Sequence, residues 1–262
     1  MLALPLTIAL LAAVDTPLVK LDLAEVKQRL AAGSESTPAD LSNTDLSGLN
    51  LSGVDFRGAN LTGSRLAEGK LAGARLFSSD LTDADLTGAD LSRANLDGTV
   101  LRRAKLQRAN LEGASLFATI IEKADLAGAN LSGARIIGYL RGAKLSGANL
   151  KKANAGADPG NQSMGVMRAT FVSADLRGAD LTGANLYKAD FSHADLSEAK
   201  LQGANLENAD LIQTDFSRAD VTGARLAKAN LDGAIFTGAI GTASLKGLEQ
   251  ARNRDRAIFD AR

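Results

Sequence analysis

The chain of 262 residues contains no cysteine and a single histidine, His193. Without cysteine it has neither a disulfide framework nor a thiolate site. One histidine excludes both a histidine relay and a metal site built from several histidines. Aromatic residues make up only 4% of the chain, and its 30 basic side chains balance 30 acidic ones. A chain without net charge predicts neither a broad polyanion-binding surface nor a strongly acidic one.

Motifs for catalysis and metal binding are missing as well. Asp80, Asp83, Asp85 and Asp90 lie close together, but without the spacing of a calcium loop. The many glycines form no phosphate loop, and no serine or threonine has a visible base partner. The sequence therefore predicts a protein that is not an enzyme, with no cofactor, metal or small-molecule substrate. The basic stretch at residues 93–123 lacks interleaved aromatics, which disfavours nucleic acid as a partner.

What the chain does contain is an apolar residue at every fifth position. The twenty positions from Leu41 to Ile136 at this spacing hold seventeen leucines, one phenylalanine and two isoleucines. The residue two positions earlier is usually alanine, and the one between them is often Asp or Asn. A short fixed period is typical of a stacked repeat architecture.

A five-residue period excludes simpler structures. A helix with 3.6 residues per turn would spread these leucines around its whole surface. A flat strand would point successive leucines to opposite faces. A chain that turns a corner after every unit keeps the small residue and the leucine inside, and glycines such as Gly48 and Gly53 suit the corners.

The unit resembles the pentapeptide-repeat family, whose consensus is Ala-Asp/Asn-Leu-X-X, over roughly residues 39 to 240. The resemblance implies an all-β solenoid, a right-handed quadrilateral β-helix with four pentapeptides per coil. Equivalent residues in adjacent coils would then lie about 4.8 Å apart. At four units per coil, the repeats predict about nine to ten coils, with short helical caps at both ends.

Residues 1–20 are predicted to form an apolar leader. Residues 1–14 are apolar apart from Thr7, too short for a bilayer span of about 20 residues, so no transmembrane segment is expected. They resemble the apolar region of a secretory signal, with cleavage expected between Ala12 and Leu18. We therefore expect a bacterial protein that is periplasmic or otherwise exported. The alternative is a cytoplasmic protein whose apolar tail packs on the solenoid end.

Both ends of the repeat region are predicted to carry caps. Residues 21–38 read as a capping helix, at 21–32, and a linker, because Gly33 is a good stop signal. The repeat region covers residues 39–243, and residues 244–262 read as a C-terminal capping helix. These helices would cover the open ends of the solenoid. A homodimer formed through an end cap is a further alternative.

Two interruptions of the repeat are predicted at one corner. After Ile136 the next inward residue is Leu140, four positions on, and residues 156–168 read as a loop insertion. Counting four faces from Leu41 places both between face four and face one. Apolar residues gather at outward positions there and in the loop, and form the candidate patch: Phe77, Val100, Phe117, Ile120, Ile137, Tyr139, Met164 and Met167. We expect the loop to cover the patch, and the alternative is a partner-binding surface.

Outward charges on face two alternate in sign from coil to coil. The column reads Asp45, Arg65, Asp85, Lys105 and Asp125. Since opposite charges directly across from each other stabilise strand pairing, the pattern predicts a ladder of ion pairs.

These features favour a non-enzymatic scaffold or binding protein that acts through interaction with an unknown protein partner. The family resemblance implies an alternative, since some members mimic duplex DNA, bind DNA gyrase and confer quinolone resistance. Such mimicry needs a predominantly acidic surface, which the zero net charge disfavours.

Overall fold

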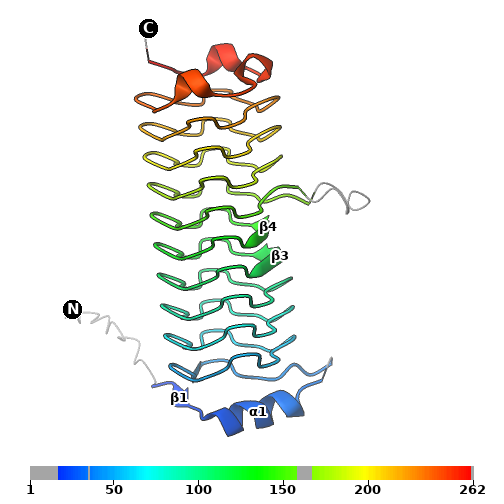
Figure 1. Cartoon of the computed structure of the whole chain (residues 1–262). Coiled ribbons are helices and arrows are strands. Elements are labelled where there is room, and N and C mark those ends of the chain that lie inside the picture. Colours follow the sequence, from blue (N-terminus) through cyan, green and yellow to red (C-terminus); the bar gives the residue numbers. More distant parts are fainter. Residues whose placement is uncertain (1–16, 35, 158–166, 261–262) are drawn as a thin grey trace, which may run out of the picture.

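The computed structural model describes residues 17–34, 36–157 and 167–260. The predicted leader therefore lies largely outside the described residues. The chain forms one elongated rod in which successive coils stack along a single axis (Figure 1). Helix α1 (Leu23–Ala32) lies across the N-terminal end, and the short 3-10 helices η2 (Thr242–Ser244), η3 (Leu248–Gln250) and η4 (Arg254–Arg256) lie at the other end.

Parallel pairings at every fifth residue hold the coils together. Asp40 pairs with Asn60, and Asn60 pairs with Asp80 on the next coil. The backbone amide of Leu41 donates to the carbonyl of Asn60 at 2.8 Å, and the same bond recurs from Leu61 to Asp80 at 2.7 Å. Four such columns, one on each face, make a quadrilateral solenoid. The buried backbone groups are thus paired between coils, as a stable solenoid requires.

The core is a set of stacked side-chain columns. Leu86, Leu106 and Leu126 follow one another on face two and are almost fully buried, with buried alanines beside them. Near the C-terminal end, phenylalanines occupy inward positions that leucines hold elsewhere. The Phe216 and Phe236 rings stack with centroids 4.8 Å apart. That separation equals the spacing of neighbouring strands, so each coil adds one layer to a continuous apolar column.

Corner geometry explains the polar part of the repeat. The amide of Ala84 donates to the carbonyl of Leu81 at 3.0 Å and closes a turn. Within that turn Asp83 adopts a φ of 59°, the left-handed conformation that turns of this kind require. The carboxylate of Asp80 accepts the amide of Thr82 at 2.8 Å. Asp and Asn recur before the central leucine because their side chains can satisfy this amide.

The first interruption is a β-bulge between the two longest strands, β3 (Ser115–Ile120) and β4 (Arg135–Tyr139), which pair in parallel (Figure 1). Phe117 pairs with Ile137 and Ile120 with Tyr139, so β4 rounds the corner with one residue fewer. Gly138 lies at the shortened corner. A Cβ there would overlap the carbonyl oxygen of Thr119 and lie only 3.2 Å from its nitrogen. The missing residue is therefore accommodated by glycine.

The second interruption adds no face to the solenoid. Tyr139 pairs with Thr170, and Lys144 pairs with Asp175. The chain thus leaves the stack after Ala157 and rejoins face one, the face that follows Ala155 in sequence. The insertion and the bulge share one corner, as the counting of faces predicts.

The N-terminal end is closed by a strand and a helix. Strand β1 (Val19–Lys20) pairs in parallel with β2 (Thr44–Asp45) and covers the edge of the first coil. Helix α1 begins after Asp22, whose carboxylate accepts the amide of Glu25 while the Glu25 carboxylate accepts the Asp22 amide. Val26 packs into the core. Helix α1 has 10 residues, and no helix in the described ranges is long and apolar enough to cross a membrane.

The C-terminal end corrects the prediction of a capping α-helix over residues 244–262. In place of one helix, three single-turn 3-10 helices alternate with bridge residues Lys246, Arg252 and Ile258, which pair with the preceding coil. Bridges therefore recur every six residues. Gly241, Gly247 and Asn253 have positive φ at the same interval. The segment is a further coil built from six-residue units, and Leu245, Leu248 and Phe259 pack against the core.

Candidate interaction surface

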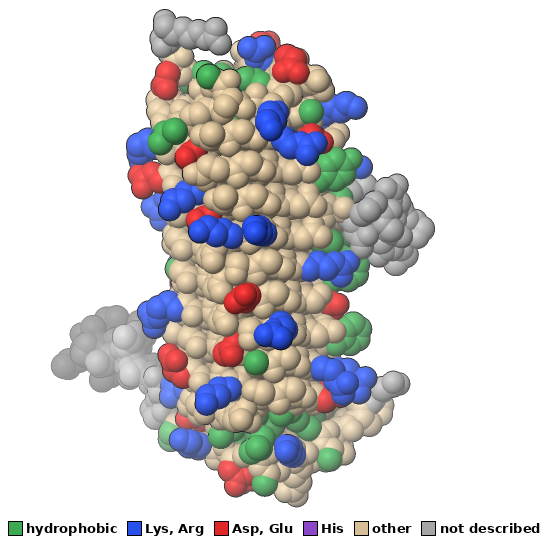
Figure 2. Space-filling view, in the orientation of Figure 1, with side chains coloured by type: hydrophobic (Ala, Val, Ile, Leu, Met, Phe, Trp, Pro, Cys, Tyr) green, Lys and Arg blue, Asp and Glu red, His purple; other side chains and the backbone are tan. Residues whose placement is uncertain are grey.

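Exposed apolar side chains follow the corner that carries the insertion. We call Phe77, Val100, Phe117, Ile120 and Tyr139 the loop-corner strip. Phe77 and Tyr139 are the most open, with 48% and 47% of their surface exposed, and the other three are half-buried. Apolar and basic side chains line this edge of the rod on both sides of the insertion (Figure 2).

Stacking of the coils aligns the strip. Val100 pairs with Ile120 and Ile120 with Tyr139, so these three side chains form one column on face one. Phe117 lies on face four, where the guanidinium of Arg135 stands 4.4 Å from its ring centroid, a cation–π contact. The carboxylate of Asp97 accepts the amide of Phe117 at 2.9 Å. The strip is thus presented by hydrogen-bonded backbone.

The remaining residues of the candidate patch are Ile137, Met164 and Met167. Ile137 retains only 2% exposure although it stands outside the continuous core cluster. Met167 is half-buried where the chain returns to the stack. Met164 lies outside the described residues. Cover of the strip by the insertion therefore stays a prediction.

Two grooves border the strip. Near the N-terminal cap, a groove of about 620 Å³ is lined by Leu30, Pro38, Asp55, Arg57 and Phe77 among others. Beyond the insertion, a groove of about 680 Å³ is lined by Arg168, Lys188, Asn208, Asp210, Lys228 and Arg252, and we call it the basic groove. No single repeat predicts this groove, because its cations come from separate units. Lys188, Asn208 and Lys228 do recur at intervals of twenty, which is the signal in the sequence that points to it.

The predicted ladder of ion pairs on face two is not present. Asp45, Arg65, Asp85 and Lys105 are neighbours in adjacent coils, but no ion pair joins them within the described part of the rod. Asp45 turns to its own corner and accepts the Ser47 amide at 3.0 Å. Ion pairs between coils form instead at other outward positions: Arg218 with Glu198 at 2.7 Å and Arg225 with Glu207 at 2.6 Å.

Asp55 is the most perturbed carboxyl group near the strip. A hydrogen bond from Arg57, supported by one from Arg75, lowers the pKa of Asp55 from 3.8 to about 2. The cause is stabilisation of the charged form by two cationic donors. Asp55 therefore remains ionised at neutral pH and screens the two arginines beside Phe77.

The acidic side chains and the histidine of the described part of the chain form no metal site. No three carboxylate or histidine side chains are grouped to hold a metal ion. Asp80, Asp85 and Asp90 stand on three different faces, and Asp83 pairs with Arg103 at the corner. His193 is exposed at a corner with a φ of 61°.

Comparison with known proteins identifies the fold family. The sequence model of the family described as "Pentapeptide repeats" matches the chain in eight copies, over residues 39–76, 79–116, 109–138, 167–203 and 199–238. The chain belongs to the pentapeptide-repeat family. Its architecture is accordingly the right-handed β-helix of that family. No curated protein matches the chain.

Solved pentapeptide-repeat structures resemble the chain to different extents. HetL of the cyanobacterium Nostoc sp. strain PCC 7120 is 31% identical to this chain, with a TM-score of 0.65. The match covers 91% of this chain and 99% of HetL, which is described as involved in heterocyst differentiation regulation. QnrB1, a plasmid-mediated fluoroquinolone resistance protein, is 20% identical with a TM-score of 0.42, covering 78% and 90%. A thylakoid-lumen protein of Arabidopsis thaliana is 29% identical with a TM-score of 0.30, covering 48% and 70%.

Proposed function

We propose that this pentapeptide-repeat protein is a non-enzymatic scaffold that binds a protein partner along the loop-corner strip. The observation that carries the proposal is the pair of exposed aromatic residues, Phe77 and Tyr139, on one edge of a rigid rod. Aromatic side chains held by a fixed backbone bury large areas at little entropic cost, and such residues dominate binding energy at interfaces. The solenoid supplies the fixed spacing.

The place of action is part of the proposal. The apolar residues 1–14 favour export to the periplasm. A role as a DNA mimic that binds gyrase receives less support, because mimicry calls for an acidic surface and the chain carries no net charge. The basic groove on the proposed binding edge also disfavours mimicry of DNA, because its lining is rich in arginine and lysine.

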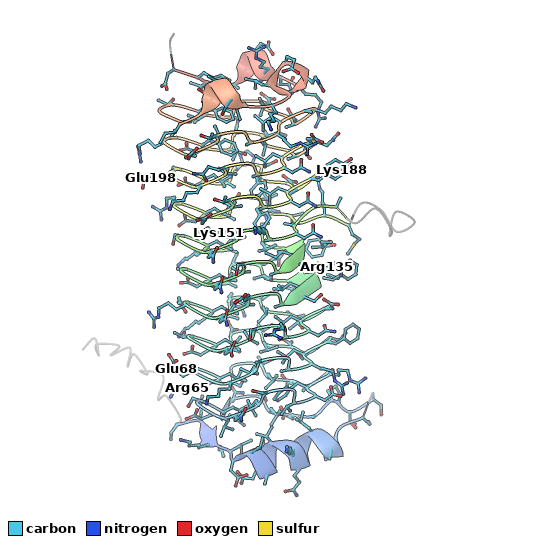
Figure 3. All side chains as sticks on the ribbon, viewed as in Figure 1. Arg65, Glu68, Arg135, Lys151, Lys188 and Glu198 are labelled. Atoms are coloured by element: carbon cyan, nitrogen blue, oxygen red, sulfur yellow. The ribbon has the colours of Figure 1, made fainter. Side chains whose placement is uncertain are left out.

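Photo-crosslinking in cells tests the proposal. A benzoylphenylalanine at position 139 would sample the strip, and one at position 198 serves as the control. Glu198 is well exposed and lies on the edge opposite Arg135 and Lys188 (Figure 3). We expect a discrete adduct with one protein from position 139, identified by mass spectrometry, and none from position 198. No adduct from position 139, or the same adducts from both positions, would contradict binding along the strip.

A further inference from the structure

The basic groove is built around one carboxylate. Arg168 donates to one oxygen of Asp210 at 2.7 Å and to Asp190 at 3.0 Å. Arg252 donates to the other oxygen of Asp210 at 3.3 Å and to the Lys228 carbonyl at 3.1 Å. The two arginines are therefore fixed on opposite sides of Asp210 while part of each guanidinium, which has five donors, remains available.

Both arginines come from outside the regular pentapeptides. Arg168 belongs to the segment that returns from the insertion, and Arg252 to the six-residue coil at the C-terminal end. The repeat pattern itself does not require either cation. Their convergence on Asp210 concentrates positive charge at one place on a chain whose total charge is zero.

Two lysines supply the charge that remains after this pairing. Lys188 and Lys228 occupy the same corner position two coils apart, a separation of about 10 Å. Neither forms an ion pair within the described ranges, whereas Asp190 and Asp210 offset the two arginines. Lys188 stands 5.3 Å from the centroid of the Tyr187 ring. The groove thus offers two separated ammonium groups.

This arrangement suits carboxylates on a peptide better than a phosphate polymer. The surplus of two positive charges is small, and the carboxylates of Asp190 and Asp210 repel a densely charged polyanion. Side chains of an extended peptide are spaced widely enough to meet the lysines singly. Lys188 of the groove also lies on the same edge as Arg135, whose guanidinium stands over Phe117 of the loop-corner strip (Figure 3), so one protein segment can contact both.

We infer that the basic groove binds an acidic segment of a protein partner, with carboxylates paired to Lys188 and Lys228. This inference rests on the proposed protein-binding function and names the chemistry of the partner. Rim charges of this kind raise association rates and select partners more than they add affinity.

Fluorescence anisotropy with a defined peptide tests the inference. The probe is a fluorescein-labelled decapeptide of alternating glutamate and serine, and the matched peptide carries glutamine in place of glutamate. The variant Lys188→Gln/Lys228→Gln removes the two free charges. The control Lys123→Gln/Lys152→Gln removes the same charge from lysines that share the repeat position and positive φ but lie at other corners.

We expect the glutamate peptide to bind the intact protein and the control variant equally, and the groove variant about tenfold more weakly, a loss of about 1.4 kcal/mol. We also expect binding to weaken with added salt. Equal weakening in both variants, equal binding of the glutamine peptide, or no binding would overturn the inference. Tighter groove-dependent binding of polyphosphate or oligothymidine would overturn the assignment to acidic peptides. Because the assay does not involve position 139, its outcome is independent of the crosslinking test.

Discussion

Replacement of Gly138 by alanine perturbs a corner where two neighbouring coils approach each other closely. A Cβ at this position would overlap the Thr119 carbonyl oxygen and lie 3.3 Å from its carbon. The obstacle is backbone, which cannot rotate away as a side chain could. The shortened corner of β4 must therefore move outward from β3 to accept the methyl group.

The expected cost follows from the hydrogen bonds at that corner. The carbonyl of Gly138 accepts the Thr170 amide at 3.0 Å, and the carbonyl of Tyr139 accepts the Ile121 amide at 2.8 Å. Loss of one or two such bonds costs about 1 kcal/mol each, and overpacking adds about 1–3 kcal/mol. We expect Gly138→Ala to lower the free energy of unfolding by about 2–5 kcal/mol.

Urea denaturation followed by circular dichroism measures this loss, and Gly147→Ala is the control. Gly147 has a φ of 64°, but a methyl group added there would have no neighbouring atom within 4 Å, so only the left-handed conformation is penalised, by about 1 kcal/mol. Hydrogen exchange at Ile121 and Thr170 should rise in the Gly138 variant alone. If Gly138→Ala lowers the free energy of unfolding no more than Gly147→Ala does, the two coils do not approach each other as closely as described.

Three further predictions concern the core, the charges and the leader. Leu106→Ala, at a fully buried position, should cost about 2–5 kcal/mol in urea denaturation through the cavity it leaves, and a negligible loss would contradict the inward phase of the repeat. The folded-state pKa of Asp55 is lowered to about 2 from 3.8, so its contribution to stability is present above about pH 4 and is lost as pH falls through about 2. Asp55→Asn should reduce stability at neutral pH much more than at about pH 2, and an equal loss at both would refute the ion pairing. If the leader is cleaved, N-terminal sequencing of fractionated cells should find a mature start between Ala12 and Leu18, whereas intact Met1 in the cytoplasm would contradict export.

The five-residue period predicts the solenoid and the inward columns because burial on a stacked fold repeats with the sequence. The position of Leu106, the corner shared by both interruptions and the role of the glycine corners all follow from counting. The C-terminal segment has a fixed interval too, but one of six residues, at which Gly241, Gly247 and Asn253 recur. The apolar residues between them imitate the pattern of an α-helix, and the prediction of a capping helix was wrong for this reason.

Side-chain directions were harder to predict than side-chain positions. Alternating charges on face two suggested ion pairs between coils, but an Asp before the central leucine has a nearer partner in the amide of its own corner, as Asp45 has in Ser47. The basic groove escaped prediction for a different reason. Arg168 and Arg252 are 84 residues apart in sequence, and only the stacking of coils brings both to Asp210.

The affinity of the partner captured at position 139 for the purified protein tests binding along the loop-corner strip most directly. The variant Phe77→Ala/Tyr139→Ala removes the two exposed aromatics of the strip. The control Ile240→Ala/Ile258→Ala removes two side chains with 61% and 52% exposure that lie on other faces. We expect the dissociation constant to rise at least about 30-fold for the strip variant, the effect of about 2 kcal/mol at an interface hot spot, and to stay unchanged for the control. An unchanged dissociation constant for the strip variant, or an equal rise for both, would contradict the proposed function.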